Sequence, residues 1–348
     1  MTFAPSRLSL PFDRAQAHGT QGVGMKQTRQ GKLRFVVPGD DPPQIQGSAH
    51  LERLKPYGEV VLYTNRPATD AEKLARVTDA DVILNTRGAV KWPGEALRQL
   101  PKLRLIATCS IGTDMLDLKT AKELGITICN QPGRTAKIVA EHGFALMFAA
   151  AKRVAYQTAQ LKQGRWARAD NVFIQGKTLG IVGTGAIGSE MARLGNAIGM
   201  KVIAWTYHPT PERAAKLGVR FVTLEELLRQ SDVVSLHVRL TPESKGMLGR
   251  RELAMMKPGA LLVNVARGDL VDTAALVESL VSGHLMGAAL DVFDKEPLPP
   301  DHPILRCEQV VLTPHIADMT PEGVELLNEG VVDNVIAFLE GRPQNVVV

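Results

Sequence analysis

TLGIVGTGAIGSEMARLGNAIGMKVIAW, residues Thr178 to Trp205, is the stretch that decides the fold of this chain. An apolar, strand-like run leads into the turn GTGAIG, a helix-period segment follows, and a second apolar run closes the unit. In such a turn the first glycine makes the bend, the second lets a pyrophosphate approach the backbone, and the third lets helix pack on strand. The helix N-terminus then offers free N–H groups to phosphates. We therefore expect dinucleotide binding at Gly183, Gly185, Ala186, Ile187 and Gly188.

The segment after the second run, KVIAW, bears on the choice between NAD and NADP. An NAD site usually carries Asp or Glu here to bind the ribose hydroxyls. This chain has Thr206, Tyr207 and His208 instead, with Arg213 nearby. No carboxylate repels a 2′-phosphate, and His208 or Arg213 can meet one. Thr206 and His208 are thus expected cofactor contacts, and both NAD and NADP stay open; an ordinary loop beside NAD is the plainer alternative.

Apolar runs alternate with helix-period segments on both sides of this unit, which predicts an α/β fold with parallel sheets. Upstream runs include LRFVVPG, VVLYT, DVILNT, LRLIATCS and ITICN; downstream runs include VVSLHV, LLVNVA, AALDVF and VVLTPH. Helices are expected around His50–Pro56, Asp70–Val77, Pro93–Leu100, Leu116–Leu124, Ala136–Lys152 and Pro321–Glu340. Capping signals support helices after Thr223, with Glu226 in a T-x-x-E box, after Asp272 and after Thr320.

The pattern predicts two parallel-sheet domains, with the dinucleotide-binding glycine turn in the second. Residues 134–315 form the dinucleotide-binding domain, and residues 32–133 with 316–348 form a discontinuous substrate-binding domain. Residues 1–31 mix Pro, Gly, Gln and His without periodicity and are expected to be a disordered extension. A transit peptide is the alternative for this segment, because Arg7 and Arg14 occur there without any Glu.

Composition excludes several classes of protein. The 348 residues are 45% hydrophobic and carry a net charge of +5, without the basic runs of a nucleic-acid binder. No apolar stretch reaches transmembrane length, so no membrane partner is expected. Three scattered cysteines, Cys109, Cys129 and Cys307, suit buried positions in a reducing, cytoplasmic protein, and no metal-ligand spacing such as C-x-x-C occurs.

Three polar residues stand just past apolar runs downstream of the glycine turn: Arg267, Glu296 and His315. A guanidinium fork can hold the carboxylate and carbonyl oxygens of a 2-oxo acid. The carbonyl oxygen needs a proton as hydride arrives, and an imidazole is the natural donor near neutral pH. A neighbouring carboxylate raises the imidazole pKa and fixes its tautomer.

Each of the three residues has a plain alternative: a surface ion pair for Arg267, loop solvation for Glu296 and a strand-end hydrogen bond for His315. Their joint position at the carboxyl ends of successive predicted strands, where ligands bind open α/β sheets, favours catalysis. The predicted site reduces a 2-oxo acid.

From Leu33 onward the chain resembles the D-isomer-specific 2-hydroxyacid dehydrogenases, on the motifs GTGAIG, SLHVRLTPES, MKPGALLVNVARGDLVD, ALDVFDKEPL and LTPHI. The resemblance implies that Arg267, Glu296 and His315 are the catalytic residues. It implies a nicotinamide-amide contact at Asp291 and further cofactor contacts at His237, Val265 and Ala266. It implies substrate loops at Arg87-Gly88 and at Ile111-Gly112, the latter before Asp114.

Two departures from the family pattern stand out. Ser110 replaces the first glycine of a substrate loop, and Asp318 adds a negative charge where small residues are usual. Arg87 is a candidate for recognising a second acidic group of the substrate, with a solvent-facing arginine as the alternative.

The resemblance further implies a Rossmann-like cofactor domain, a flavodoxin-like substrate domain, and a homodimer built partly from the Ala136–Lys152 region. The expected substrate is of the glyoxylate or hydroxypyruvate type, or a broad range of 2-oxo acids. His315 argues against the formate dehydrogenases of this fold, which use Gln there. The alternative function is a catalytically weak, dinucleotide-sensing scaffold of the C-terminal-binding-protein type.

Overall fold

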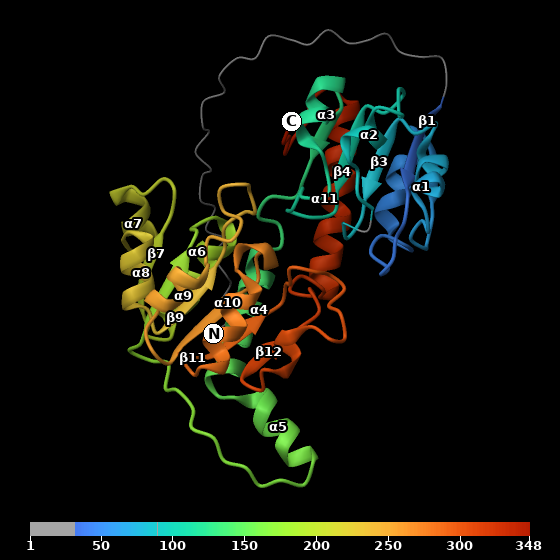
Figure 1. Cartoon of the computed structure of the whole chain (residues 1–348). Helices are drawn as coiled ribbons and strands as arrows, with labels where there is room; N and C mark the ends of the chain where they lie inside the picture. The colour runs from blue at the N-terminus through green and yellow to red at the C-terminus, as the bar shows by residue number, and fades with distance from the viewer. Residues whose placement is uncertain (1–31, 89) are drawn as a thin grey trace, which may run out of the picture. The chain divides into compact units, whose positions relative to one another are not determined.

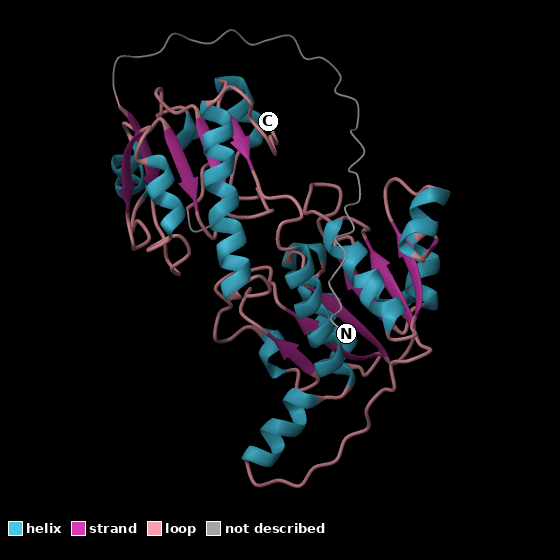
Figure 2. Cartoon of the chain, turned by 180° about the vertical axis from the view of Figure 1, so that it is seen from behind, coloured by secondary structure: helices cyan, strands magenta, loops and turns pink. Residues whose placement is uncertain are grey.

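The computed structural model describes residues 32–88 and 90–348; the extension expected at 1–31 lies outside these residues. Within the described part the chain builds one five-stranded and one seven-stranded parallel sheet (Figure 1). Seen from behind, the strands of each sheet are flanked by helices (Figure 2). The predicted α/β class with two parallel-sheet units is confirmed.

The seven-stranded sheet has the order β12-β11-β10-β9-β6-β7-β8. This order, read from β6, is the doubly wound arrangement in which the chain first fills one side and then crosses to the other. The switch point lies between β6 and β9, and there the His237 N–H donates to the Val182 carbonyl at 2.8 Å. The strands are β6 (Thr178–Val182), β7 (Lys201–Trp205), β8 (Arg220–Phe221), β9 (Val233–Leu236), β10 (Ala260–Asn264), β11 (Leu285–Leu290) and β12 (Val310–Leu312).

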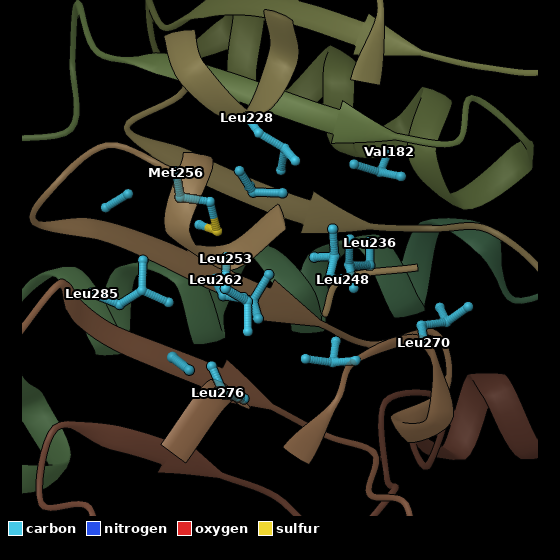
Figure 3. Close-up of a cluster of buried hydrophobic side chains, with 14 of the residues drawn as sticks. Val182, Leu228, Leu236, Leu248, Leu253, Met256, Leu262, Leu270, Leu276 and Leu285 are labelled. Atoms are coloured by element: carbon cyan, nitrogen blue, oxygen red, sulfur yellow. The ribbon is translucent and has the colours of Figure 1, made fainter. Parts of the chain in front are cut away.

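Alternate residues of these strands bury two separate cores, because successive side chains of a strand point to opposite faces. Leu262 and Leu236 lie in one core with Leu228, Leu253 and Leu276 from three helices (Figure 3). The other face packs on α4 and α6. The helices are α4 (Ala136–Ala151), α6 (Ala186–Ala197), α7 (Pro211–Leu217), α8 (Leu224–Gln230), α9 (Arg250–Met255) and α10 (Thr273–Val281), with short η2 (Gly268–Leu270) and η3 (Pro303–Arg306).

The five-stranded sheet has the order β2-β1-β3-β4-β5, the flavodoxin-like order that was predicted. Its strands are β1 (Leu33–Val37), β2 (Gly58–Leu62), β3 (Val82–Asn85), β4 (Leu105–Thr108) and β5 (Thr127–Cys129). Its helical elements are η1 (Ala49–Leu54), α1 (Asp70–Val77), α2 (Gly94–Leu97), α3 (Leu118–Leu124) and α11 (Pro321–Leu339).

Helix α11 comes from the far end of the sequence yet belongs to the core of the five-stranded sheet. Leu327 and Val331 are fully buried there with Phe35 and Leu105. The residues after α11 continue this contact, since the Ile128 N–H donates to the Val348 carbonyl at 3.1 Å. The packing agrees with the expected return of the last helix to the first sheet; the domain boundaries proposed above remain a prediction.

The helix-capping predictions are confirmed. The Thr223 side chain accepts from the Glu226 N–H while Glu226 accepts from the Thr223 N–H, the reciprocal pair of a capping box. Asp272 and Thr320 cap α10 and α11.

Two helix predictions differ from the structure, and one observed helix was missed. The helix expected around His50–Pro56 is the 3-10 segment η1, and Pro93–Leu100 shortens to α2, because each buries only one or two apolar side chains. Helix α5 (Val154–Lys162) was not predicted, and its weakly amphipathic sequence gives the reason.

Among the described residues, none of the helices is long and apolar enough to cross a membrane. The same residues contain no group of three or more His, Cys, Asp or Glu side chains able to hold a metal ion.

Candidate active site

Three parallel strands deliver the predicted trio to one edge of the seven-stranded sheet. Arg267 follows β10, Glu296 follows β11 and His315 follows β12, and these strands are neighbours in the sheet. His315 Nδ1 and Glu296 Oε2 are 2.7 Å apart. Glu296 Oε1 also accepts from the Phe293 N–H at 2.9 Å, so the carboxylate is fixed by its own loop. The structure thus joins two of the three residues into an acid–imidazole pair.

The pair shifts both pKa values in the sense that general acid catalysis needs. For His315, burial lowers the pKa, but the hydrogen bond and charge of Glu296 outweigh it and raise the pKa above 6.5. For Glu296, burial raises the pKa, and the hydrogen bond and charge of His315 with the Phe293 N–H bring it below 4.5. Both shifts favour an imidazolium bound to a carboxylate.

The backbone of His315 is held in a strained conformation. Its φ is +54°, in the left-handed region that non-glycine residues rarely adopt. The buried Asp291 carboxylate accepts from the Ile316 N–H and the Ala317 N–H, both at 3.0 Å, and from the Thr313 hydroxyl at 2.5 Å. These bonds fix the backbone on either side of the imidazole.

Helix α4 contributes a second histidine to this network. His142 Nε2 lies 3.1 Å from Thr313 Oγ1 and 3.4 Å from Asp291 Oδ1. The Asp291 carboxylate has no exposed surface and is already engaged by its own loop. Its expected contact with the nicotinamide amide therefore remains a prediction. The hydrogen bonds of Asp291 directly support another role, which is to position the loop that carries His315.

Arg267 lies against the loop after β4. Its Nε donates to Asp114 Oδ2 at 2.5 Å, and its Nη1 donates to the Ala266 carbonyl at 2.7 Å. A Cβ on Gly112 would lie 1.7 Å from Arg267 Nη2, so only glycine allows this approach. The guanidinium is thereby placed against the predicted Ile111-Gly112 substrate loop.

The glycine turn after β6 has the geometry that its sequence predicts. Gly183 has φ +96°, which favours glycine, and a Cβ on Gly188 would lie 1.9 Å from the Gly183 carbonyl oxygen. At Gly185 a Cβ would meet nothing within 4 Å, so the space over the backbone is open. Ala186 and Ile187 then begin α6, whose first N–H groups face that space.

His237, at the end of β9, closes the other side of this turn. Its ring is buried, which lowers its pKa to about 3 and keeps it neutral. Nε2 lies 2.8 Å from Ser235 Oγ, while Nδ1 is buried without a hydrogen-bond partner among the described residues. A ring nitrogen without a hydrogen-bond partner among the described residues, next to the glycine turn, is compatible with the cofactor contact that was predicted for His237.

Helix α7, which follows the loop after β7, brings Arg213 to the glycine turn. Its Nη2 donates to Thr184 Oγ1 at 2.8 Å and to the Thr184 carbonyl at 2.9 Å, and its Nη1 donates to the His208 carbonyl at 2.5 Å. Thr206 and His208 flank exposed Tyr207 in this loop. A cation thus stands beside the glycine turn, and the cofactor contacts expected at Thr206 and His208 stay predictions.

Val265 and Ala266 lie between β10 and Arg267. Val265 is 7% exposed and packs on α4, where a Cβ on Gly143 would be 3.3 Å from its methyl group. Ala266 is partly exposed, and its N–H donates to Asn264 Oδ1 at 3.0 Å. The structure gives Val265 a clear packing role, and its cofactor contact stays a prediction.

The two predicted substrate loops leave the carboxyl ends of β3 and β4. The Ile111 carbonyl accepts from Asn130 Nδ2 at 2.7 Å, and the Gly112 carbonyl accepts from the Ser110 hydroxyl at 2.9 Å. Arg87 and Gly88 both have positive φ, +49° and +57°. Arg87 is bound to Asp318, at 2.7 Å, and is not solvent-facing.

Sequence reasoning missed two members of the site, His142 and Thr313. Thr313 stands just before Pro314-His315, and a hydroxyl beside a candidate acid is a usable signal. His142 lies in the middle of α4 with no motif around it. Only the packing of α4 on the seven-stranded sheet brings it to Asp291.

The fold and this edge of the sheet place the chain in the broad class of dinucleotide-dependent oxidoreductases. Residues 144–317 match the family model described as "D-isomer specific 2-hydroxyacid dehydrogenase, NAD binding domain", and the chain belongs to that family. It is therefore an enzyme that depends on a nicotinamide dinucleotide, as the sequence predicted.

Known relatives agree. The chain is 38% identical over 305 residues to glyoxylate reductase of Korarchaeum cryptofilum, covering 85% of this chain and 92% of that protein. It is 37% identical over 276 residues to D-3-phosphoglycerate dehydrogenase of Archaeoglobus fulgidus, covering 78% of this chain and 52% of that protein. D-lactate dehydrogenase from Aquifex aeolicus, solved with NAD and lactic acid, superposes with a TM-score of 0.78 at 31% identity, covering 89% of this chain and 96% of that one.

Proposed function

We propose that this enzyme reduces a small 2-oxo acid, of the glyoxylate or hydroxypyruvate type or over a broader range, to the D-2-hydroxy acid. The observation that carries the proposal is the 2.7 Å contact between His315 and Glu296 next to Arg267. The bound nicotinamide supplies or accepts the hydride.

Arg267 orients the substrate in this proposal. Its Nη2, pressed against Gly112, faces the loop that receives the substrate carboxylate. Asp114 and the Ala266 carbonyl fix the other two nitrogens, so the guanidinium keeps one direction. A planar donor fork holds the carboxylate and carbonyl oxygens together.

His315 moves the proton. Glu296 occupies Nδ1, which leaves Nε2 to protonate the carbonyl oxygen as negative charge develops on it. The raised pKa keeps the imidazolium populated near neutral pH. In the reverse direction the neutral imidazole accepts the hydroxyl proton.

For the cofactor we propose that both NADH and NADPH bind. The loop Thr206–His208 carries no carboxylate, and the Arg213 guanidinium lies across it. A cation there favours a 2′-phosphate, whereas its two hydrogen bonds to Thr184 and one to the His208 carbonyl also suit a purely structural role.

We also propose a cytoplasmic homodimer assembled through the region of α4 and α5. The three cysteines are free and buried, which suits a reducing compartment. Val154, Leu161, Trp166 and Phe173 are exposed by 49%, 52%, 78% and 69%, on α5 and the loop after it. Apolar surface of this kind marks an interaction site. Light scattering of the purified protein measures the mass; a monomer contradicts the assembly.

One assay tests the proposal. Purified enzyme is mixed with NADH or NADPH and a panel of 2-oxo acids, and absorbance at the reduced nicotinamide band is followed. We expect turnover of glyoxylate or hydroxypyruvate. Tight cofactor binding without turnover of any 2-oxo acid would instead favour the dinucleotide-sensing scaffold.

A further inference from the structure

The Arg87–Asp318 ion pair is the feature that the catalytic proposal leaves unexplained. Arg87 Nη1 donates to Asp318 Oδ1 at 2.7 Å, and the two side chains are 10% and 26% exposed. A pair this buried is not a solvated surface contact, and removing one partner leaves a costly charge behind. The pair is electrically neutral as a unit.

The remaining donors of Arg87 have no acceptor. Nε and Nη2 are both buried and lack a hydrogen-bond partner among the described residues. Leaving buried donors unpaired is unfavourable, so such groups in a folded protein call for an explanation. The nearby Asp40 carboxylate does not provide one, because it accepts from the backbone N–H groups of Gln44, Ile45 and Gln46.

Both ends of the pair adjoin the proposed site. A Cβ on Gly88 would lie 2.8 Å from the Met115 methyl group, and Met115 follows Asp114, the partner of Arg267. Asp318 follows Ala317, whose N–H is bound by Asp291 in the loop that carries His315. Through these neighbours, Arg87 and Asp318 connect the loop that contacts Arg267 with the loop that carries His315.

We propose that Asp318 is a specificity-determining residue. It neutralises Arg87, so that the pair offers N–H donors to an uncharged oxygen on the distal end of the 2-oxo acid, such as a hydroxyl, and rejects a second carboxylate or a phosphate. This inference rests on the proposed function and names its substrate class.

Charge explains the selectivity. A lone guanidinium at this position would attract a second anion, whereas Asp318 repels it at similar range and already occupies Nη1. A hydroxyl oxygen accepts from Nε or Nη2 without that repulsion. A methyl group in the same place leaves the donors unpaired, which disfavours it.

The test is Asp318→Asn, with kcat/KM measured for pyruvate, hydroxypyruvate and phosphohydroxypyruvate. These substrates carry a methyl, a hydroxyl and a phosphate at the same carbon. We expect the wild type to prefer hydroxypyruvate, and Asp318→Asn to move the preference toward the phosphorylated acid by at least about tenfold, since like-charge juxtaposition costs several kcal/mol. An unchanged ratio overturns the inference while hydroxypyruvate turnover keeps the proposed function.

Asp333→Asn is the matched control. Asp333 is 27% exposed, close to the 26% of Asp318, and also pairs with arginines, Arg53 and Arg134. Its removal should leave the substrate ratio unchanged. A shift as large as that of Asp318→Asn contradicts a local effect.

Two further measurements keep the test decisive. If Asp318→Asn does not fold, the double variant Arg87→Gln with Asp318→Asn removes both charges; it should lose the preference for hydroxypyruvate over pyruvate, and retention overturns the inference. If no 2-oxo acid turns over, calorimetric titration of the enzyme–NADH complex with D-glycerate and D-3-phosphoglycerate decides. Asp318→Asn must then gain affinity for the phosphorylated acid alone.

Discussion

The loops of the seven-stranded sheet and those of the five-stranded sheet hold their polar side chains in different ways. Glu296, Asp291 and His315 are fixed by hydrogen bonds among the loops that follow β11 and β12. On the other sheet, Asp114 and Arg87 bind partners from distant parts of the sequence, Arg267 and Asp318.

Under the proposed function, the two regions have separate tasks. Groups that transfer a proton need constant geometry for every substrate, and local backbone bonds provide it. Groups that recognise the substrate, such as Arg87, act together with a charged partner from a distant part of the chain. Replacing that partner changes which substrate is preferred. Substitutions in the first region should therefore change all substrates alike, whereas Asp318 should change their ratio.

The largest expected effect is that of His315→Ala. Loss of a general acid should lower kcat by ~10²–10⁴-fold, by the same factor for each 2-oxo acid. Steady-state rates on the substrate panel measure it, and fluorescence titration with NADH should show unchanged cofactor affinity. If the loss of kcat in His315→Ala differs strongly among the 2-oxo acids, proton transfer and substrate recognition are not separated between the two regions.

Glu296→Gln should move the alkaline limb of the pH profile. Reduction requires the imidazolium, so kcat/KM falls as pH rises through the raised pKa of His315. Without the carboxylate, burial prevails and the pKa drops, so the limb moves to lower pH. Profiles of kcat/KM against pH for two substrates measure this; a limb that stays in place shows that another group titrates.

Gly185→Ala should weaken cofactor binding without loss of stability. A Cβ there meets nothing within 4 Å, so only a bound pyrophosphate can collide with it. We expect an increase of about tenfold or more in the dissociation constant for NADH, with an unchanged melting temperature. Gly188→Ala is the contrast, since its Cβ would lie 1.9 Å from the Gly183 carbonyl oxygen and should destabilise the fold itself.

The smallest effect belongs to Thr223→Ala, which removes the capping box of α8. Loss of such a cap costs ~1 kcal/mol of unfolding free energy. Chemical denaturation should show that loss while kcat and the substrate ratio stay the same. A change in either kinetic quantity ties α8 to the site, contrary to the packing.

Local signals in the sequence predicted most of the fold and the position of Arg267, Glu296 and His315 at one edge of the sheet. The glycines of the turn, the caps Thr223, Asp272 and Thr320, and the strand alternation each act over a few neighbouring residues. The trio was found because parallel strands bring their carboxyl ends to one edge, so spacing along the chain translates into proximity.

What the sequence did not predict depends on tertiary contact. His142 reaches Asp291 only because α4 packs across the sheet. Arg87 meets Asp318 although the two are far apart in sequence, so no local pattern signals the pair. His315 has a left-handed backbone conformation, and Asp291 accepts hydrogen bonds from the N–H groups of residues 316 and 317 beside it. Because the residue is not glycine, the sequence gives no sign of this conformation.

Helix α11 has a consequence for synthesis on the ribosome. Leu327, Val331, Val332 and Val335 complete a hydrophobic layer whose strands were translated near the start of the chain. The seven-stranded sheet is encoded between β5 and α11, so the ribosome has synthesised all of its strands before it reaches α11. We therefore expect the middle of the chain to reach its native state first, and the earliest strands to await the last helix, which reverses the usual order of nascent folding.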